Sequence, residues 1–175
     1  MFDIGDKVVY PVHGAGTIES IEEKEVLGEK HRYYIMRLSF GNLTVMIPTE
    51  NIKSVGLREI IDPKGVKKVY KILGEENINP EINWNQRYKA NMEKIKSGNI
   101  YEVAEVVKSL MSREKEKALS TGEKKILDTA KQIMISELIL AGETDEAEII
   151  SYIDNALEKT SWISGVFFVN YSTRT

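Results

Sequence analysis

The chain has 175 residues, of which 42% are hydrophobic, and a formal net charge of −3 at pH 7. This composition suffices for one substantial core or two small ones and argues against a wholly disordered chain. The absence of cysteine excludes disulfides and thiolate metal sites. The amino terminus has no basic segment followed by a long apolar run, and no segment approaches the ~20 apolar residues of a membrane span. We therefore expect a cytoplasmic protein that does not contact a membrane.

The charges are unevenly distributed along the chain. Residues 1–62 carry 7 Lys and Arg against 10 Asp and Glu, residues 63–131 carry 15 against 10, and residues 132–175 carry 2 against 7. A basic middle block therefore lies between two acidic segments. We expect any polyanionic partner to contact this middle block.

The first part of the chain has the pattern of short β-strands. Four runs rich in apolar and β-branched residues are separated by turn sequences that contain glycine. The runs are residues 7–12, 16–23, 31–40 and 43–48, and the turns are residues 13–16, 27–30 and 40–42. Four or five short antiparallel strands in about sixty residues predict a small barrel of the SH3 or Tudor type. Barrels of this type usually bind partners rather than catalyse reactions.

From Asp62 onward the spacing of apolar residues changes from two to 3.6, which predicts a domain boundary near residue 60. Asp62 followed by Pro63 is typical of a helix start, and Gly74 is typical of a helix end. Three later pairs have the spacing of a capping box, in which two side chains close the first turn of a helix. The pairs are Asn83 with Gln86, Asn99 with Glu102 and Ser120 with Glu123. A last helix is expected to begin at Thr144.

These patterns predict an α+β protein with two domains. Residues 1–60 form the antiparallel β-barrel, residues 61–160 form an all-α bundle of about five helices, and residues 161–175 form a tail without an assigned role. The helices are expected to pack through apolar faces on the two longest helices. These faces are Val103, Val107 and Leu110 on one helix, and Ile126, Ala130, Ile133 and Met134 on the other.

Residues suited to catalysis are few. The only histidines are His13 and His31, and no serine lies in a nucleophile-elbow sequence. The glycines at 14–16 lead into β-type sequence, whereas a phosphate-binding loop must open onto the amino terminus of a helix. We therefore expect neither an enzyme nor a bound cofactor or metal ion.

The segment INWNQRYKANMEKI places Trp84 beside Arg87 and Lys89 in the basic block. Helical spacing puts Trp84 on one face with Tyr88 and Met92, which is typical of an ordinary core residue. Its position in the first turn also allows the ring to project past the bundle while Tyr88 and Met92 remain inside. An exposed ring with basic neighbours would suit kinked or melting DNA, where the ring stacks on a base and the cations hold phosphates. The residues alone leave both interpretations open.

Six separated motifs carry a resemblance to a known family. The motifs are GDKVVYPVHGAGTIESIE, LTVMIPTEN, VGLREI, NWNQRYKANMEKIKSGN, EVAEVVKSL and LSTGEKKIL. Together and in this order, they resemble the CarD/CdnL family of bacterial transcription regulators, from about residue 2 to residue 158. The amino-terminal part is also similar to the RNA-polymerase-interacting module of transcription-repair coupling factors, which lack the helical domain.

The resemblance implies a transcription regulator with two contacts. The barrel would bind the β subunit of RNA polymerase, and the helical domain would bind promoter DNA at the upstream edge of the bubble and stabilise the open complex. There Trp84 would wedge into the minor groove at the fork junction between paired and unpaired DNA. The implied DNA-binding residues are Trp84, Arg87, Lys89, Lys124 and Lys125. The implied polymerase-binding residues are Lys24, Val45, Met46 and Ile47.

Met46 departs from the family pattern, because some members have an arginine at this position. An apolar side chain removes one salt bridge and favours strand pairing and apolar packing against the partner. Two alternatives to the transcription regulator remain at this stage. One is a protein-only adaptor, in which Trp84 belongs to the core and the helical domain binds another regulator rather than DNA. The other is an unrecognised hydrolase or transferase. We expect a monomer that acts when bound to polymerase.

Overall fold

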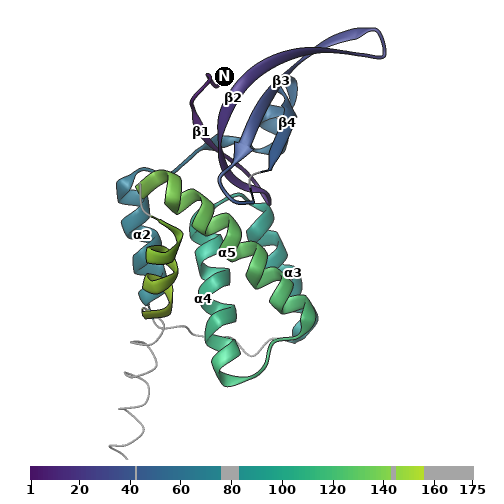
Figure 1. Cartoon of the computed structure of the whole chain (residues 1–175). Coiled ribbons are helices and arrows are strands. Elements are labelled where there is room, and N and C mark those ends of the chain that lie inside the picture. The colour runs from purple at the N-terminus through teal and green to yellow at the C-terminus, as the bar shows by residue number, and fades with distance from the viewer. Residues whose placement is uncertain (42, 76–82, 143–144, 156–175) are drawn as a thin grey trace, which may run out of the picture.

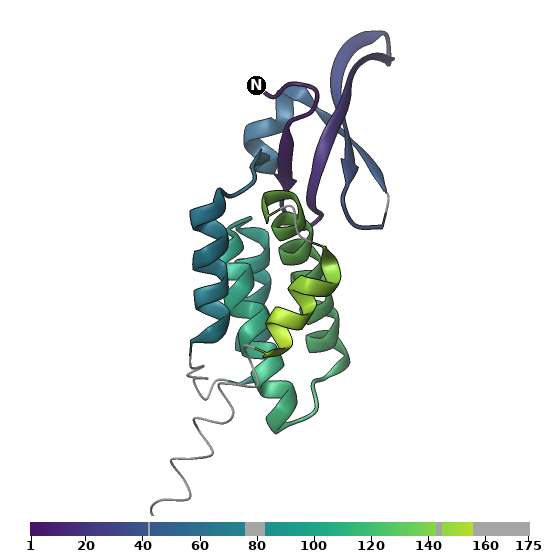
Figure 2. The same cartoon turned by 60° about the vertical axis from the view of Figure 1, so that its left-hand side comes forward.

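The computed structural model describes residues 1–41, 43–75, 83–142 and 145–155. It combines an antiparallel sheet with a helical bundle, and Figures 1 and 2 show the sheet at one end of the bundle. The predicted α+β fold class is therefore confirmed. The predicted tail at 161–175 lies outside the described residues.

Five strands form the sheet. They are β1 (Lys7–Tyr10), β2 (Gly14–Val26), β3 (Glu29–Leu38), β4 (Thr44–Pro48) and β5 (Arg58–Glu59). Their order is β4-β3-β2-β1-β5, and each neighbouring pair is antiparallel. The sheet is open rather than closed into the expected barrel, because the two residues of β5 both pair with β1 and leave β4 at the opposite edge.

The helical bundle follows the sheet. Its elements are α2 (Pro63–Gly74), α3 (Trp84–Lys96), α4 (Ile100–Glu116) and α5 (Thr121–Gly142), and residues 146–155 are also helical. Two short helices, η1 (Thr49–Asn51) and α1 (Ile52–Val55), connect β4 to β5. The side chains of Asp62, Asn83 and Asn99 accept backbone N–H groups at the starts of α2, α3 and α4. Ser120 and Glu123 form a reciprocal capping box at the start of α5, so these predicted helix starts are confirmed.

β2 and β3 form a long hairpin whose far end extends away from the rest of the molecule (Figure 1). Pairing continues to Val26 opposite Glu29. Leu27 (φ 54°) and Gly28 (φ 84°) make the connecting turn, and two consecutive positive φ angles are those of a type I′ turn. The turn is therefore only two residues long, and β3 begins within the segment 27–30 that was predicted as a turn.

Two glycines of the segment 13–16, predicted as a turn, belong to β2 instead. Gly14 (φ 103°) lies against the side chain of Ser136 in α5. A Cβ at Gly16 would overlap the backbone carbonyl oxygen of Arg37 in β3. The turn interpretation is wrong for Gly14, whereas Gly16 lies in a strand as the predicted run 16–23 has it. Both glycines let the strand approach its neighbours closely.

The sheet and the bundle each have an apolar core. The core of the sheet contains Val8, Tyr34 and Ile47 among its buried residues. The core of the bundle includes both apolar faces predicted from the sequence. These faces comprise Val103, Val107, Leu110, Ile126, Ala130, Ile133 and Met134, all of which are buried.

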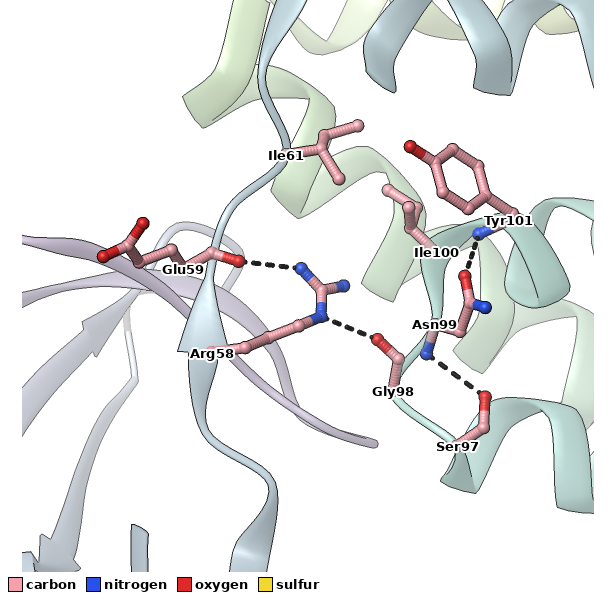
Figure 3. Close-up of a pocket in the computed structure, with 8 residues that line it drawn as sticks. All are labelled: Arg58, Glu59, Ile61, Ser97, Gly98, Asn99, Ile100 and Tyr101. Atoms are coloured by element: carbon pink, nitrogen blue, oxygen red, sulfur yellow. Dashed lines mark hydrogen bonds between the residues drawn. The ribbon is translucent and has the colours of Figure 1, made fainter. Parts of the chain in front are cut away.

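A buried polar cluster joins the sheet to the bundle. Glu137 of α5 is fully buried, and its carboxylate accepts two hydrogen bonds from Arg58 of β5, at 2.7 and 2.8 Å. The same carboxylate accepts the backbone N–H of Ile61 at 3.0 Å. Arg58 also donates to the carbonyl of Gly98, between α3 and α4, at 2.9 Å (Figure 3). One guanidinium thus connects the sheet, the end of α3 and α5, which holds the sheet and the bundle in one orientation.

Candidate functional site

Trp84 is the first residue of α3, at the end of the helix farther from the sheet. The other end of α3 reaches the sheet through the contact between Gly98 and Arg58. A helix of 13 residues is about 20 Å long, which separates Trp84 from the junction by that distance. The Trp84 side chain is 44% exposed, so the interpretation of Trp84 as an ordinary core residue is wrong.

Two contacts fix the Trp84 ring. The indole Nε1–H donates to Ser120 Oγ at 3.0 Å. The ring centroid lies 5.3 Å from that of Tyr88, with an angle of 31° between the two ring planes. The ring is therefore held by the protein on one side and is accessible to a partner elsewhere.

The three α3 residues that follow Trp84 on its helical face differ in burial. Met92 packs against the bundle core, as expected, and Ile95 is buried in that core. Tyr88 is 36% exposed, so the expectation that it lies inside is wrong. A Cβ added at Gly122 would lie 3.4 Å from the Tyr88 ring and 3.5 Å from the Trp84 ring. Both rings therefore lie over the first turn of α5, at a position where a small residue leaves room for them.

Arg87 points toward α5 and not only toward solvent. Its Nε lies 2.9 Å and its second terminal nitrogen 2.8 Å from Glu123 Oε1, and its side chain is 14% exposed. Arg113 of α4 lies 3.6 Å from the same oxygen. Glu123 is buried, so this carboxylate connects α3, α4 and α5.

The hydrogen bonds of Glu123 determine its charge state. Burial alone would raise the pKa of its carboxyl, but the N–H and hydroxyl of Ser120 and the guanidinium of Arg87 outweigh burial and lower the pKa below its ordinary value of 4.5. Glu123 is therefore an anion at neutral pH. It neutralises part of the positive charge that Arg87 brings to this surface.

The three lysines predicted to contact DNA are exposed. Lys89 lies on α3, and Lys124 and Lys125 lie in the first two turns of α5, close to Ser120. None of the three forms an ion pair with another residue in the described part of the chain. They therefore add exposed basic side chains to α3 and to the start of α5, the two elements that meet at Trp84.

The residues predicted to bind polymerase lie on or beside the edge strand β4. Met46 is 46% exposed, and Lys24 Nζ lies 3.6 Å from its sulfur atom. Val45 is partly buried, and Ile47 is 1% exposed. The side chain of Ile47 therefore packs in the sheet core and is not available to a partner at the sheet edge. Lys24 also pairs with Glu22 at 3.4 Å.

The edge of β4 has backbone groups directed outward. The Leu38 N–H donates to the carbonyl of Leu43 at 2.8 Å, and regular pairing continues from Thr44 to Pro48. Because bonded and non-bonded residues alternate in an antiparallel pair, Met46 directs its N–H and C=O away from β3. This edge offers a further strand both hydrogen-bonding groups and the exposed Met46 side chain.

A hollow between β5 and the turn from α3 to α4 is lined by residues that include Arg58, Glu59, Ser97, Asn99 and Tyr101. Arg58, Ser97 and Asn99 already form hydrogen bonds with other residues there, and the Glu59 carboxylate points away from them (Figure 3). The convergent titratable groups that the hydrolase or transferase hypothesis requires are not found there. Within the described ranges, no three His, Asp or Glu side chains gather to hold a metal ion, and no helix is long and apolar enough to cross a membrane.

The sequence predicts the residues near Trp84 but not the contacts that connect them. Glu137 stands in the apolar run from Ile133 to Leu140, and a carboxylate in such a run indicates a buried partner. The sequence predicts Ser120 only as part of a helix cap. Its contact with Trp84 joins residues 36 positions apart, and no local pattern reveals such a contact.

Known proteins resemble this chain over most of its length. The family model described as "CarD-like/TRCF RID domain" matches residues 2–61, and the one described as "CarD, C-terminal domain" matches residues 68–154. The "Putative transcription factor YdeB" of Bacillus subtilis (strain 168) is 49% identical over 152 residues, which cover 87% of this chain and 99% of that protein.

Two solved structures from Myxococcus xanthus are similar to about a third of the chain. The 72-residue amino-terminal domain of CarD is 34% identical, covers 34% of this chain and 79% of its own, and has a TM-score of 0.30. The CdnLNt structure is 44% identical, covers 35% of this chain and 86% of its own, and has a TM-score of 0.31.

Proposed function

Since the chain belongs to the CarD family of transcription factors and carries the family's RNA-polymerase-interacting domain, we propose that it binds RNA polymerase and promoter DNA at the same time. The sheet binds the β subunit, and the helical bundle binds the upstream edge of the bubble and stabilises the open complex. The observation that carries this proposal is the half-exposed ring of Trp84, held at the protein surface near Lys124 and Lys125.

The contact with the β subunit uses the outer edge of β4. A strand of the partner pairs with the outward N–H and C=O of Met46, and the Met46 side chain packs against apolar groups of the partner. Lys24, beside Met46, adds a positive charge at the rim of this contact. Val45 and Ile47 support the strand from the core side. The polymerase contact thus combines backbone pairing with one apolar anchor.

The contact with DNA uses the far end of the bundle. The Trp84 ring enters the minor groove at the fork junction, where the bases are unpaired, and Lys89, Lys124 and Lys125 contact phosphates. Arg87 contributes in a different way, because its guanidinium already binds Glu123. Any phosphate contact of Arg87 shares the guanidinium with that carboxylate.

The ring stabilises the open complex by binding the melted junction and not the closed duplex. A ligand shifts an equilibrium only by its difference in affinity for the two states. Stacking on one base contributes about 1–3 kcal/mol, which corresponds to a change of roughly 5- to 150-fold in the ratio of open to closed complex. The junction formed by Glu137 and Arg58 keeps Trp84 at a set distance from the polymerase-binding edge, so both contacts form together.

The test uses purified polymerase, a promoter fragment and two variants that affect different contacts. Trp84→Ala is expected to keep polymerase affinity and to lose the increase in open-complex lifetime. Met46→Pro removes one outward N–H of β4 without removing a bond to β3, so it is expected to lose polymerase affinity. Chemical unfolding of both variants checks that the fold is retained.

The proposal fails if Trp84→Ala, with its fold intact, prolongs the open complex as the wild-type protein does. The protein-only adaptor makes the opposite prediction for stability. It requires Trp84 in the core, so that the alanine variant would unfold, whereas the observed half-exposure of Trp84 predicts a folded variant.

A further inference from the structure

We infer that Ser120 and Gly122, at the start of α5, are positioning residues that hold the Trp84 ring in its DNA-binding orientation before DNA is bound. This inference rests on the proposed function of Trp84. Neither residue needs to touch DNA. They act through the geometry that they impose on the ring.

The hydroxyl of Ser120 is fully used in this arrangement. It accepts the indole N–H of Trp84 at 3.0 Å and the backbone N–H of Glu123 at 3.2 Å, and it donates to Glu123 Oε2 at 2.9 Å. A hydroxyl offers one donor and two acceptor positions, and all three are occupied. The residue that caps α5 therefore also fixes the polar edge of Trp84.

Gly122 provides the surface on which the rings lie. A Cβ at this position would meet Tyr88 at 3.4 Å and Trp84 at 3.5 Å, which are ordinary contact distances. A methyl group therefore fits there, whereas a longer side chain would displace both rings. The Trp84 ring is thus held by Ser120 at its edge and by Tyr88 and Gly122 beside it.

Glu123 connects Ser120 and the Trp84 ring to the rest of the bundle. Its carboxylate binds Ser120 through the N–H and the hydroxyl, and it binds Arg87 of α3 through the other oxygen. The first turn of α5 and the first turn of α3 are therefore tied together, with Trp84 between them. A ring held in this way needs no ordering when it enters the DNA junction.

The expected effect follows from this pre-organisation. Ordering one side chain on binding weakens a complex by about two- to tenfold. Loss of the Ser120 hydroxyl should therefore shorten the open-complex lifetime by about two- to tenfold, less than the full loss expected for Trp84→Ala. Ser120→Thr restores a hydroxyl and should restore the lifetime.

Stability must be separated from positioning, because Ser120→Ala also removes a helix cap. Asn99→Ala removes the cap of α4, whose side chain accepts the Tyr101 N–H, and provides a matched control far from the ring. Gly122→Leu tests positioning without the loss of a helix cap. Leucine favours a helix more than glycine does, so the variant stays stable while its side chain displaces the Trp84 ring.

Two measurements on the full chain test this inference: acrylamide quenching of Trp84 fluorescence and the open-complex lifetime. Since the sequence has two tryptophans, Trp84 and Trp162, a Trp162→Phe background makes intrinsic fluorescence report Trp84 alone. We expect Ser120→Ala and Gly122→Leu to change acrylamide quenching of Trp84 and to shorten the open-complex lifetime. Gly122→Ala, Ser120→Thr and Asn99→Ala should match the wild-type protein in both measurements.

The inference is overturned if quenching and lifetime in Ser120→Ala equal those in Asn99→Ala, or if Gly122→Leu behaves as the wild-type protein does. Failure of the proposed function looks different. In that case Trp84→Ala leaves the lifetime unchanged, and the fluorescence measurement still shows whether Ser120 and Gly122 hold the ring.

Discussion

Replacement of Glu137 by alanine is expected to lower the free energy of unfolding by about 2–4 kcal/mol and to uncouple the sheet from the bundle. The Glu137 carboxylate is fully buried and binds Arg58 at 2.7 and 2.8 Å and the Ile61 N–H at 3.0 Å. Both partners belong to the segment that leads from the sheet into α2. The change therefore removes three hydrogen bonds at the junction.

The magnitude follows from the groups left behind. A partly buried N–H without an acceptor costs about 1–3 kcal/mol, and removal of one member of a buried ion pair costs about 3–5 kcal/mol. The second figure is an upper bound here, because the Arg58 side chain is 30% exposed and keeps its bond to Gly98. The expected loss in the free energy of unfolding is therefore about 2–4 kcal/mol, because water can solvate part of the Arg58 guanidinium.

Urea unfolding followed by far-ultraviolet circular dichroism measures both effects. The wild-type protein should unfold in one transition, and Glu137→Ala should show a lower midpoint and a broader or divided transition. Glu105→Ala is the matched control, since it removes the same carboxylate from an exposed pair with Lys94 and should cost less than about 1 kcal/mol. A loss in Glu137→Ala no larger than in this control would show that the Glu137 carboxylate does not stabilise the junction.

Two further predictions concern Glu123 and Gly16. Because the pKa of Glu123 is lower in the folded than in the unfolded chain, its ionisation stabilises the fold above about pH 4.5 and this contribution is lost as the pH falls below that value. Glu123→Gln should therefore lose less stability than the wild-type protein between pH 7 and pH 3.5 in urea unfolding, and an equal loss would contradict this role. Gly16→Ala should destabilise the fold by at least about 2 kcal/mol, because its Cβ would overlap the Arg37 carbonyl. Gly74→Ala is the control and should not destabilise the fold, because there is open space around Gly74. Equal urea midpoints for the two variants would exclude the overlap.

Much of the fold could be predicted from local patterns. The helix starts at Asp62, Asn83 and Ser120 follow from side chains that bond backbone groups within three residues, so the necessary information is local. The alternation of residues in β2 and β3 likewise predicts strands. The length of their hairpin was not predicted, because Leu27 adopts a positive φ that its residue type does not suggest.

Local sequence patterns identify which residues begin α2, α3, α4 and α5, where the basic block lies and which family the motifs resemble. Tertiary packing sets the half-exposure of Trp84, the ion pair of Arg87 with Glu123 and the junction of Glu137 with Arg58. These outcomes depend on pairs separated by 36 to 79 positions. Periodicity and caps constrain neighbours within one helical turn, whereas packing of whole helices selects the distant partners.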